Sequence, residues 1–289
     1  MPHTTLTAKL ADHDVRRIGF GAMQLAGPGV FGPPRDRDAA LAVLRRAVEL
    51  GVDHIDTSQY YGPDVVNALI REALHPYPDG LRLVTKVGAR RDDQGGWLPA
   101  LRPEELRAGV EDNLRTLDVE QLTLVNLRLL DGAPGTGAIP PLAEMLGALD
   151  DLRREGKLEL IGLSNVTRAV LEEALDLVPI ASVQNQYSVL DRSNEDVLEA
   201  CREHGLAFVP FFPLGSAFTG GPQRLAKDPA IARVAAKHGA TPSQVALAWL
   251  LQRDERILLI PGTSSVAHLE ENLAAAEVEL GADDMAALE

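Results

Sequence analysis

The chain has 289 residues, of which 45% are hydrophobic and 24% charged, a composition typical of globular proteins. Its formal net charge of −14 argues against a nucleic-acid or anionic-membrane partner, because phosphate groups would be repelled. A single cysteine, Cys201, excludes an intrachain disulfide and a cysteine-based metal site, and we expect no metal. We expect a cytoplasmic protein, because neither an apolar signal core nor an apolar run of membrane-spanning length is present.

Eight short apolar runs predict β-strands, and segments with helical periodicity separate them. The predicted strands are residues 18–21, 52–56, 81–86, 122–127, 160–164, 182–184, 206–210 and 257–260. The predicted helices include residues 39–48 before Gly51, 104–117 after Pro103, and 241–251 with Thr241 as N-cap and Pro242 at the first helical position.

Strand and helix alternate eight times, which predicts an α/β fold, a (β/α)8 TIM barrel in one domain of residues 1–289. Residues 6–16 are expected to form a hairpin at the barrel bottom. Gly and Pro cluster at 27–34, 95–96, 132–135 and 220–222, after strands that end on the C-terminal face, where such barrels build active sites. A doubly wound open sheet is the alternative, disfavoured because the first strand–helix junction lacks a G-x-G-x-x-G turn.

Three polar residues at strand ends suggest proton transfer. Asp56, Tyr61 and Lys86 follow the second and third predicted strands and are expected to meet at one barrel rim. A tyrosine beside a lysine can donate a proton to a carbonyl oxygen, and the lysine charge is expected to lower the tyrosine pKa. The aspartate would keep the lysine charged and oriented. A turn cap, a packed loop tyrosine and a surface lysine are the structural alternative.

Motifs in nearly the whole chain resemble the aldo-keto reductase family, in family order. They are residues 19–23, 56–58 with 61–62, 85–86, 162–165, 184, 260–263 and 268–272. Within the family, residues 21–37, 125–128 and 210–215 are most similar to the bacterial pyridoxal reductase branch. The resemblance implies NADPH-dependent reduction of an aldehyde or ketone, with pyridoxal as the expected substrate.

The resemblance also implies a catalytic tetrad of Asp, Tyr, Lys and His. Asp56, Tyr61 and Lys86 match its first three members, and the family spacing selects Tyr61 over Tyr60. The fourth position is a departure, because Arg128 aligns with the histidine. Arginine can donate to a carbonyl oxygen but stays protonated, so it cannot relay a proton as a neutral group. It can instead pair with Asp56 or Asp131 as part of the barrel wall.

For the cofactor, the resemblance assigns the carboxamide contacts to Ser164, Asn165 and Gln184. Strand-end capping is the alternative for these side chains. Phe211 takes the place of an aromatic residue that stacks on nicotinamide, with core packing as its alternative. Leu214, Gly215 and Ser216 would follow the pyrophosphate with their backbone N–H groups. The other predicted cofactor contacts are Gly21, Ala22, Met23, Phe212, Gly262 and Thr263.

The 2′-phosphate and adenine are assigned to residues after the eighth strand. Ser264 and His268 stand where many family members carry Arg or Lys, so NADP preference is expected to rest on weaker electrostatics. Glu271 and Asn272 match the adenine contacts. Trp97 is expected to cover the substrate, and Arg90 and Arg91 lie nearby.

Three further functions stay open at this point. The chain can be a general reductase of other small aldehydes, or a slow NADP-binding regulatory subunit of the kind found in this family. It can also be a Schiff-base aldolase, since Lys86 ends a barrel strand. The small-molecule carbonyl substrate is the expected partner, and the sequence does not predict an oligomeric state.

Overall fold

The structure is a computed structural model that describes residues 6–130, 139–216 and 220–289. Seven parallel strands form one sheet in the order β11-β10-β9-β8-β5-β4-β3. They are β3 (Phe20–Gly21), β4 (His54–Asp56), β5 (Arg82–Val87), β8 (Leu122–Arg128), β9 (Leu158–Ser164), β10 (Ser182–Gln184) and β11 (Ala207–Phe208).

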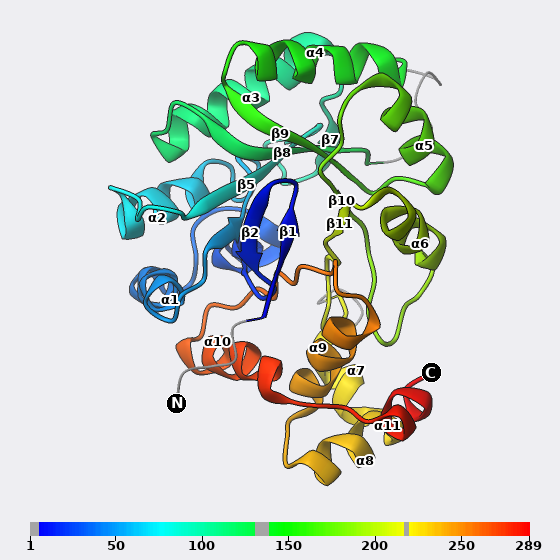
Figure 1. The fold of residues 1–289 in the computed structure, drawn as a ribbon. Coiled ribbons are helices and arrows are strands. Elements are labelled where there is room, and N and C mark those ends of the chain that lie inside the picture. The colour runs from blue at the N-terminus through cyan, green and yellow to red at the C-terminus, as the bar shows by residue number, and fades with distance from the viewer. Residues whose placement is uncertain (1–5, 131–138, 217–219) are drawn as a thin grey trace.

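The predicted eighth strand closes the sheet into a barrel. Ile257 forms a parallel bridge with Phe208 of β11, and Leu259 forms one with Ile18, two residues before β3. Residues 257–260 make isolated bridges rather than the continuous strand that the sequence predicts. The two edges of the sheet are nevertheless joined, and the predicted (β/α)8 barrel is confirmed (Figure 1).

Helices surround the barrel (Figure 1). Those that follow the successive strands are α1 (Arg37–Glu49), α2 (Val65–Leu74), α3 (Pro103–Leu117), α4 (Leu142–Arg154), α5 (Arg168–Leu177), α6 (Glu195–His204), α9 (Pro242–Arg253) and α10 (Val266–Leu273). The additional helices are α7 (Gly221–Lys227), α8 (Pro229–His238), α11 (Ala282–Ala287) and the short η1 (Ala22–Leu25), η2 (Pro28–Val30) and η4 (Ala274–Glu277). None of the helices in the described part of the chain is long and apolar enough to span a membrane.

Local sequence explains where these helices begin. Asp36 caps α1 by accepting a hydrogen bond from the Ala39 amide at 2.9 Å. Thr241 is the N-cap of α9, as predicted, and its hydroxyl accepts from the Gln244 amide while the Gln244 side chain accepts from the Thr241 amide. Helix α9 is apolar on all sides because α7, α8, α10 and η4 cover it in addition to the barrel.

The N-terminal hairpin closes one end of the barrel, as predicted. Strands β1 (Thr7–Leu10) and β2 (His13–Arg16) are antiparallel and lie across the barrel opening (Figure 1). Leu10 and Val15 form an apolar cluster with inward-facing residues of the barrel strands, including Val84, Leu124 and Leu258. The hairpin therefore removes from water the apolar bottom of the barrel interior.

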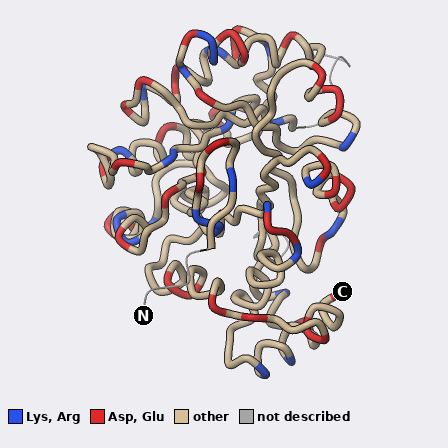
Figure 2. Tube along the Cα trace, in the orientation of Figure 1, with Lys and Arg blue, Asp and Glu red and all other residues tan. Residues whose placement is uncertain are grey.

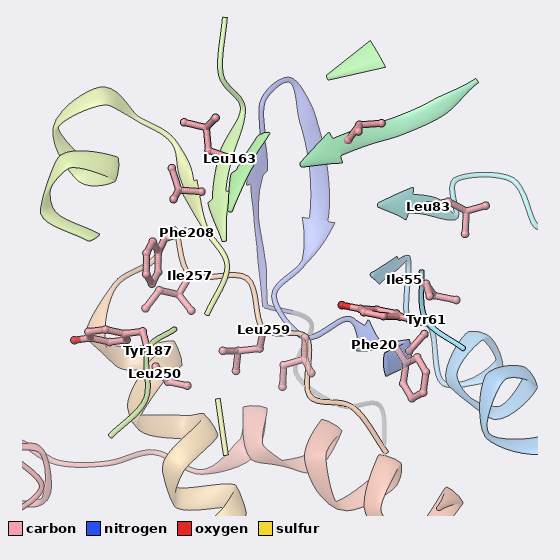
Figure 3. Packing of buried hydrophobic residues seen from close by; sticks show 14 of the residues in the cluster. Phe20, Ile55, Tyr61, Leu83, Leu163, Tyr187, Phe208, Leu250, Ile257 and Leu259 are labelled. Atoms are coloured by element: carbon pink, nitrogen blue, oxygen red, sulfur yellow. The ribbon is translucent and has the colours of Figure 1, made fainter. Parts of the chain in front are cut away.

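A second and larger core lies between the strands and the helices. Figure 3 shows part of it, with Phe20, Ile55 and Leu83 on one side and Leu163, Phe208 and Ile257 on the other. Charged residues of both signs are spread over the surrounding helices (Figure 2). This division between apolar interior and charged exterior is what the amphipathic helix patterns predict.

One element is absent from the sequence prediction. After β5, strands β6 (Ala89–Arg91) and β7 (Trp97–Pro99) form an antiparallel hairpin with Arg91 opposite Trp97. The predicted glycine pair at 95–96 lies in its turn, and Gly220 and Gly221 lie at the start of α7. The predicted loop at 132–135 lies outside the described residues.

Candidate active site

A cavity of about 530 Å³ opens at the C-terminal ends of the strands. It brings together most of the predicted site: Gly21, Met23, Asp56, Tyr61, Lys86, Trp97, Arg128, Gln184, Phe211, Phe212, Leu214, Gly215, Gly262, Thr263 and Ser264. The predicted residues that do not line it are Ala22, Ser164, Asn165, His268, Glu271 and Asn272.

Asp56 and Lys86 form a buried ion pair in this cavity. Asp56 ends β4 and is paired in register with Val84 of β5, so Lys86, two residues further, projects to the same face of the sheet. Lys86 Nζ donates to Asp56 Oδ1 at 2.5 Å and to the Thr57 carbonyl at 3.1 Å. The aspartate therefore fixes the lysine in place, as expected.

Tyr61 lies against this pair. The Lys86 Nζ atom is 5.1 Å from the centroid of the Tyr61 ring. In Figure 3 the Tyr61 hydroxyl points away from the core residues Phe20 and Ile55. Burial, and secondarily the negative charge of Asp56, raise the pKa of Tyr61, while Arg128 lowers it. The expectation that Lys86 lowers the Tyr61 pKa is not met, because Asp56 offsets the lysine charge and burial disfavours the phenolate.

Gln184 reaches Asp56 from the other side of the barrel. It ends β10, which three strands separate from β4, and its Nε2 donates to Asp56 Oδ2 at 2.9 Å. The carboxylate accepts hydrogen bonds, so the amide nitrogen faces it and the amide oxygen faces away. Gln184 Oε1 is buried and has no hydrogen-bond partner among the described residues. It is an acceptor available to an amide donor in the cavity.

Arg128 also faces the cavity. It ends β8 opposite Ser164 of β9, and its Nη1 donates to the Ser164 hydroxyl at 3.0 Å. Its guanidinium carbon lies 4.9 Å from the centroid of the Phe211 ring. Among the described residues no ion pair joins Arg128 to Asp56, and Asp131 lies outside them. Arg128 therefore lines the same cavity as Asp56, Tyr61 and Lys86.

Asn165 and Ser164 support this rim rather than line the cavity. Asn165 adopts a left-handed conformation with φ of 61° at the end of β9. Its Nδ2 donates to the carbonyls of Leu129 and Leu130 at 2.7 and 3.0 Å. Asn165 therefore holds the chain that follows Arg128. These hydrogen bonds are of the strand-end capping kind named above as the alternative to a cofactor contact.

Gly21 and Gly262 lie where the first strand meets the segment that closes the barrel. A Cβ at Gly21 would be 2.4 Å from the Ile260 carbonyl oxygen, and one at Gly262 would be 2.5 Å from the Gly21 carbonyl oxygen. No side chain fits at either position without movement of the backbone. Both glycines line the cavity, so this close approach shapes its floor.

A smaller cavity of about 380 Å³ adjoins the first at Ser264. The two cavities share Met23, Gln24, Val30 and Ser264, and the smaller one is also lined by Arg35 and Asp36. The Asp36 carboxylate caps α1, whereas the exposed Arg35 side chain forms no hydrogen bond or ion pair within the described residues. Arg35, which is not among the predicted site residues, thus brings a positive charge to the cavity that Ser264 also lines.

The residues after Ser264 form the start of α10. Ser265 caps α10 by accepting from the His268 amide, and the Thr263 hydroxyl accepts from the Ser265 amide. His268 is exposed on α10. The Glu271 carboxylate accepts from the Thr241 hydroxyl at 2.6 Å, which ties α10 to α9, and Asn272 is buried. Glu271 and Asn272 lie outside both cavities, and their contact with adenine stays a prediction.

Trp97 lines the cavity at the position expected for a substrate cover. Its ring makes an edge contact with Tyr60, with centroids 5.6 Å apart, and Tyr60 makes one with Tyr61 at 5.4 Å. Gln24, Val30, Tyr60 and Leu130 also line the cavity but are absent from the sequence prediction. Their side chains are apolar or neutral, so the sequence does not mark them as site residues. Their place in the cavity depends on the conformation of the segments that carry them.

The fold and the site define the class to which the chain belongs. The model of the aldo/keto reductase family matches residues 17–289, and the chain is a member of that family. It is 50% identical over 283 residues to pyridoxine 4-dehydrogenase of Escherichia coli (strain K12), which covers 98% of this chain and 97% of that protein. It is 39% identical over 284 residues to the uncharacterized oxidoreductase C215.11c of Schizosaccharomyces pombe, covering 98% of this chain and 89% of that one.

Solved structures agree with this assignment. The thermostable aldo-keto reductase Tm1743, solved with the inhibitor epalrestat, superposes with a TM-score of 0.83 at 29% identity, over 98% of each chain. An aldo/keto reductase from Klebsiella pneumoniae, solved with NADP and acetate, gives a TM-score of 0.79 at 25% identity over 99% of this chain and 94% of that one.

Proposed function

We propose that this chain is a cytoplasmic, one-domain, NADPH-dependent carbonyl reductase that converts pyridoxal to pyridoxine. The observation that carries the proposal is the convergence of Tyr61, the Asp56–Lys86 pair and the unpartnered oxygen of Gln184 on one cavity. The choice of pyridoxal rests on the 50% identity to a pyridoxine 4-dehydrogenase along nearly the whole of both chains.

The cavity residues fit NADPH. The buried Gln184 Oε1 can accept a hydrogen bond from a carboxamide amino group, and the Phe211 ring offers a face for stacking. Leu214 and Gly215 follow Phe211 along the cavity wall, where their backbone amides are suited to the pyrophosphate. Ser264, with Arg35 in the adjoining cavity, is suited to the 2′-phosphate. When bound, the cofactor supplies the hydride.

The protein supplies the proton and the charged groups around the reacting carbonyl. Tyr61 donates its phenolic proton to the carbonyl oxygen as negative charge develops there, and its raised pKa keeps that proton available. Arg128, which has no ion-pair partner among the described residues, places positive charge beside the same oxygen, and the paired Lys86 lies against the Tyr61 ring. Asp56 holds Lys86 in an ion pair, which disfavours the aldolase alternative because that lysine is not free to attack a carbonyl.

The test is a comparison of aldehydes and ketones with NADPH and with NADH, followed through the absorbance of the reduced cofactor. We expect reduction of pyridoxal with NADPH, and oxidation of pyridoxine with NADP in the reverse direction. If the protein reduces other small aldehydes but not pyridoxal, it is a general reductase and the pyridoxal assignment is wrong. Tight NADPH binding without turnover of any carbonyl compound would favour the regulatory subunit.

Substitution Tyr61→Phe tests the assigned acid. It should lower kcat by about 10²–10⁴-fold, the range that positioned acids contribute, and leave the Kd of NADPH unchanged. Tyr60→Phe is the control, because it keeps the ring contacts with Tyr61 and Trp97 and removes a hydroxyl at the neighbouring position. A Tyr61→Phe enzyme that keeps more than about a tenth of wild-type kcat would exclude Tyr61 as the sole acid.

A further inference from the structure

Arg91 joins two loops that are far apart in the sequence. Its guanidinium donates to the carbonyl oxygens of Val30 at 2.7 Å and Gly29 at 3.0 Å, in the segment after β3. It also donates to the carbonyl of Gly95 at 2.6 Å, in the turn of the β6–β7 hairpin. One side chain thus ties the loop after the first strand to the loop after the third.

The same guanidinium lies against two aromatic rings. Its carbon is 4.0 Å from the centroid of the Trp97 ring and 5.3 Å from that of Phe31. Trp97 is 38% exposed, so the barrel core does not hold its ring in place. Its described ring contacts are Arg91 on the face and Tyr60 at the edge, which makes Arg91 a main determinant of where the ring lies.

The backbone of Val30 is strained and needs support from its neighbours. It is a β-branched residue with φ of 58°, in the left-handed region that such residues avoid. Its carbonyl accepts hydrogen bonds from Arg91 and from the Gly62 amide, at 2.7 and 3.2 Å. A strained conformation persists where surrounding contacts fix it, and Val30 lines the cavity.

We propose that Arg91 is a positioning residue that holds Trp97 and Val30 as one wall of the substrate end of the cavity, and that this wall selects planar aromatic aldehydes. This inference rests on the carbonyl reductase function proposed above. The wall, together with Tyr60 and Phe212, presents three aromatic rings to the cavity, and such surfaces favour a flat ring over a short alkyl chain. Arg91 does not line the cavity, so it acts through the residues that it holds.

The first experiment is Arg91→Gln, which removes the charge and the three-way hydrogen bonding. KM for pyridoxal and for 4-nitrobenzaldehyde should rise about tenfold, as expected for loss of a cation–π contact and charged hydrogen bonds that order the wall. The kcat for these aldehydes, the kcat/KM for propanal and the Kd of NADPH should stay unchanged. Arg91→Lys, which keeps the charge but not the fork of donors, should restore part of the loss.

Arg90→Gln is the matched control. Arg90 is the neighbouring residue in β6, carries the same charge and is exposed on the opposite face of the hairpin, without a side-chain partner among the described residues. It should behave as wild type. Trp97→Leu should reproduce the selective rise in KM, and the double variant with Arg91→Gln should be no worse than Trp97→Leu alone.

A spectroscopic measurement tests the wall without turnover. The chain has two tryptophans, and Trp249 is fully buried, so the difference in emission between the wild-type protein and a Trp97→Phe variant reports Trp97. Acrylamide quenching of that emission should increase in Arg91→Gln. Unchanged quenching, or an equal loss of activity on propanal and on both aromatic aldehydes, would overturn the proposal. Reduction of 4-nitrobenzaldehyde but not of pyridoxal would refute the pyridoxal assignment and leave the Arg91 comparison valid.

Discussion

The surroundings of Tyr61 favour its protonated form, which the proposed reduction requires. Burial and the charge of Asp56 raise its pKa, and Arg128 is the described group that lowers it. In the proposed mechanism reduction uses the Tyr61 phenol, so its kcat should stay level from about pH 6 to pH 9, below the ordinary tyrosine pKa of about 10. Oxidation of the alcohol uses the phenolate, so its rate should rise with pH over the same range.

Arg128→Met should change the rates of both reduction and oxidation. Removing the positive charge raises the Tyr61 pKa further, so the rise in the oxidation rate should move to higher pH. In reduction, loss of a charged donor beside the carbonyl oxygen should cost ~1.5–3 kcal/mol in kcat/KM. Melting temperatures of the same preparations are the control. A stable variant with an unchanged pH profile and kcat/KM would remove Arg128 from the catalytic group.

Arg35 and Ser264 set the expected preference for NADPH over NADH. Arg35→Gln should weaken NADPH binding by about 3–10-fold, because the exposed charge is partly screened by solvent, and leave NADH binding unchanged. Arg45→Gln removes the same charge from an exposed position further along α1 and should have no effect. Ser264→Arg should strengthen NADPH binding. Equal Kd values of both cofactors in the wild-type enzyme would refute the phosphate assignment.

Among the elements, those with a strong apolar period were predictable and those built by distant contacts were not. Strand 182–184 matches the sequence prediction. The starts of α3 and α9 also match it, because a capping residue or a proline marks each of them locally. The β6–β7 hairpin was missed because residues 89–99 lack an alternating apolar pattern, and the contact of Arg91 with Trp97 spans it. Polar strand ends indicated Asp56 and Lys86, and the family resemblance indicated Gln184, but the hydrogen bonds among them depend on closure of the barrel.

The N-terminal hairpin is expected to contribute stability without affecting catalysis. Leu10 is buried against the inward-facing residues Val84 and Leu124, at the end of the barrel opposite the cavity. Leu10→Ala should lower the free energy of unfolding by about 2–4 kcal/mol through lost burial and a residual void. The kcat/KM for pyridoxal should not change under conditions where the variant is folded. A large loss of activity in a stable Leu10→Ala protein would show that the hairpin influences the site.

For the molecule as a whole, closure of the barrel depends on Gly21 and Gly262. Gly21→Ala would place a methyl group 2.4 Å from the Ile260 carbonyl oxygen, so the two chain segments must separate. We expect a lower melting temperature and weaker NADPH binding together, since both follow from the same displacement. Gly147→Ala in α4 is the control, because its new methyl group meets no atom within 4 Å, and it should stabilise the protein by about 0.5–1 kcal/mol. Independent changes in stability and binding would contradict a shared cause.

The position of Arg91 has a consequence for how such an enzyme can diversify. Of the proposed catalytic groups, Asp56, Lys86 and Arg128 end barrel strands and Tyr61 lies in the loop directly after β4. Arg91, Val30 and Trp97 belong instead to the segments after β3 and β5. A lineage can therefore exchange one substrate for another by remodelling those two segments while the reaction stays intact. Because Arg91 couples them, the two segments should be inherited, or transplanted into another barrel, as a pair.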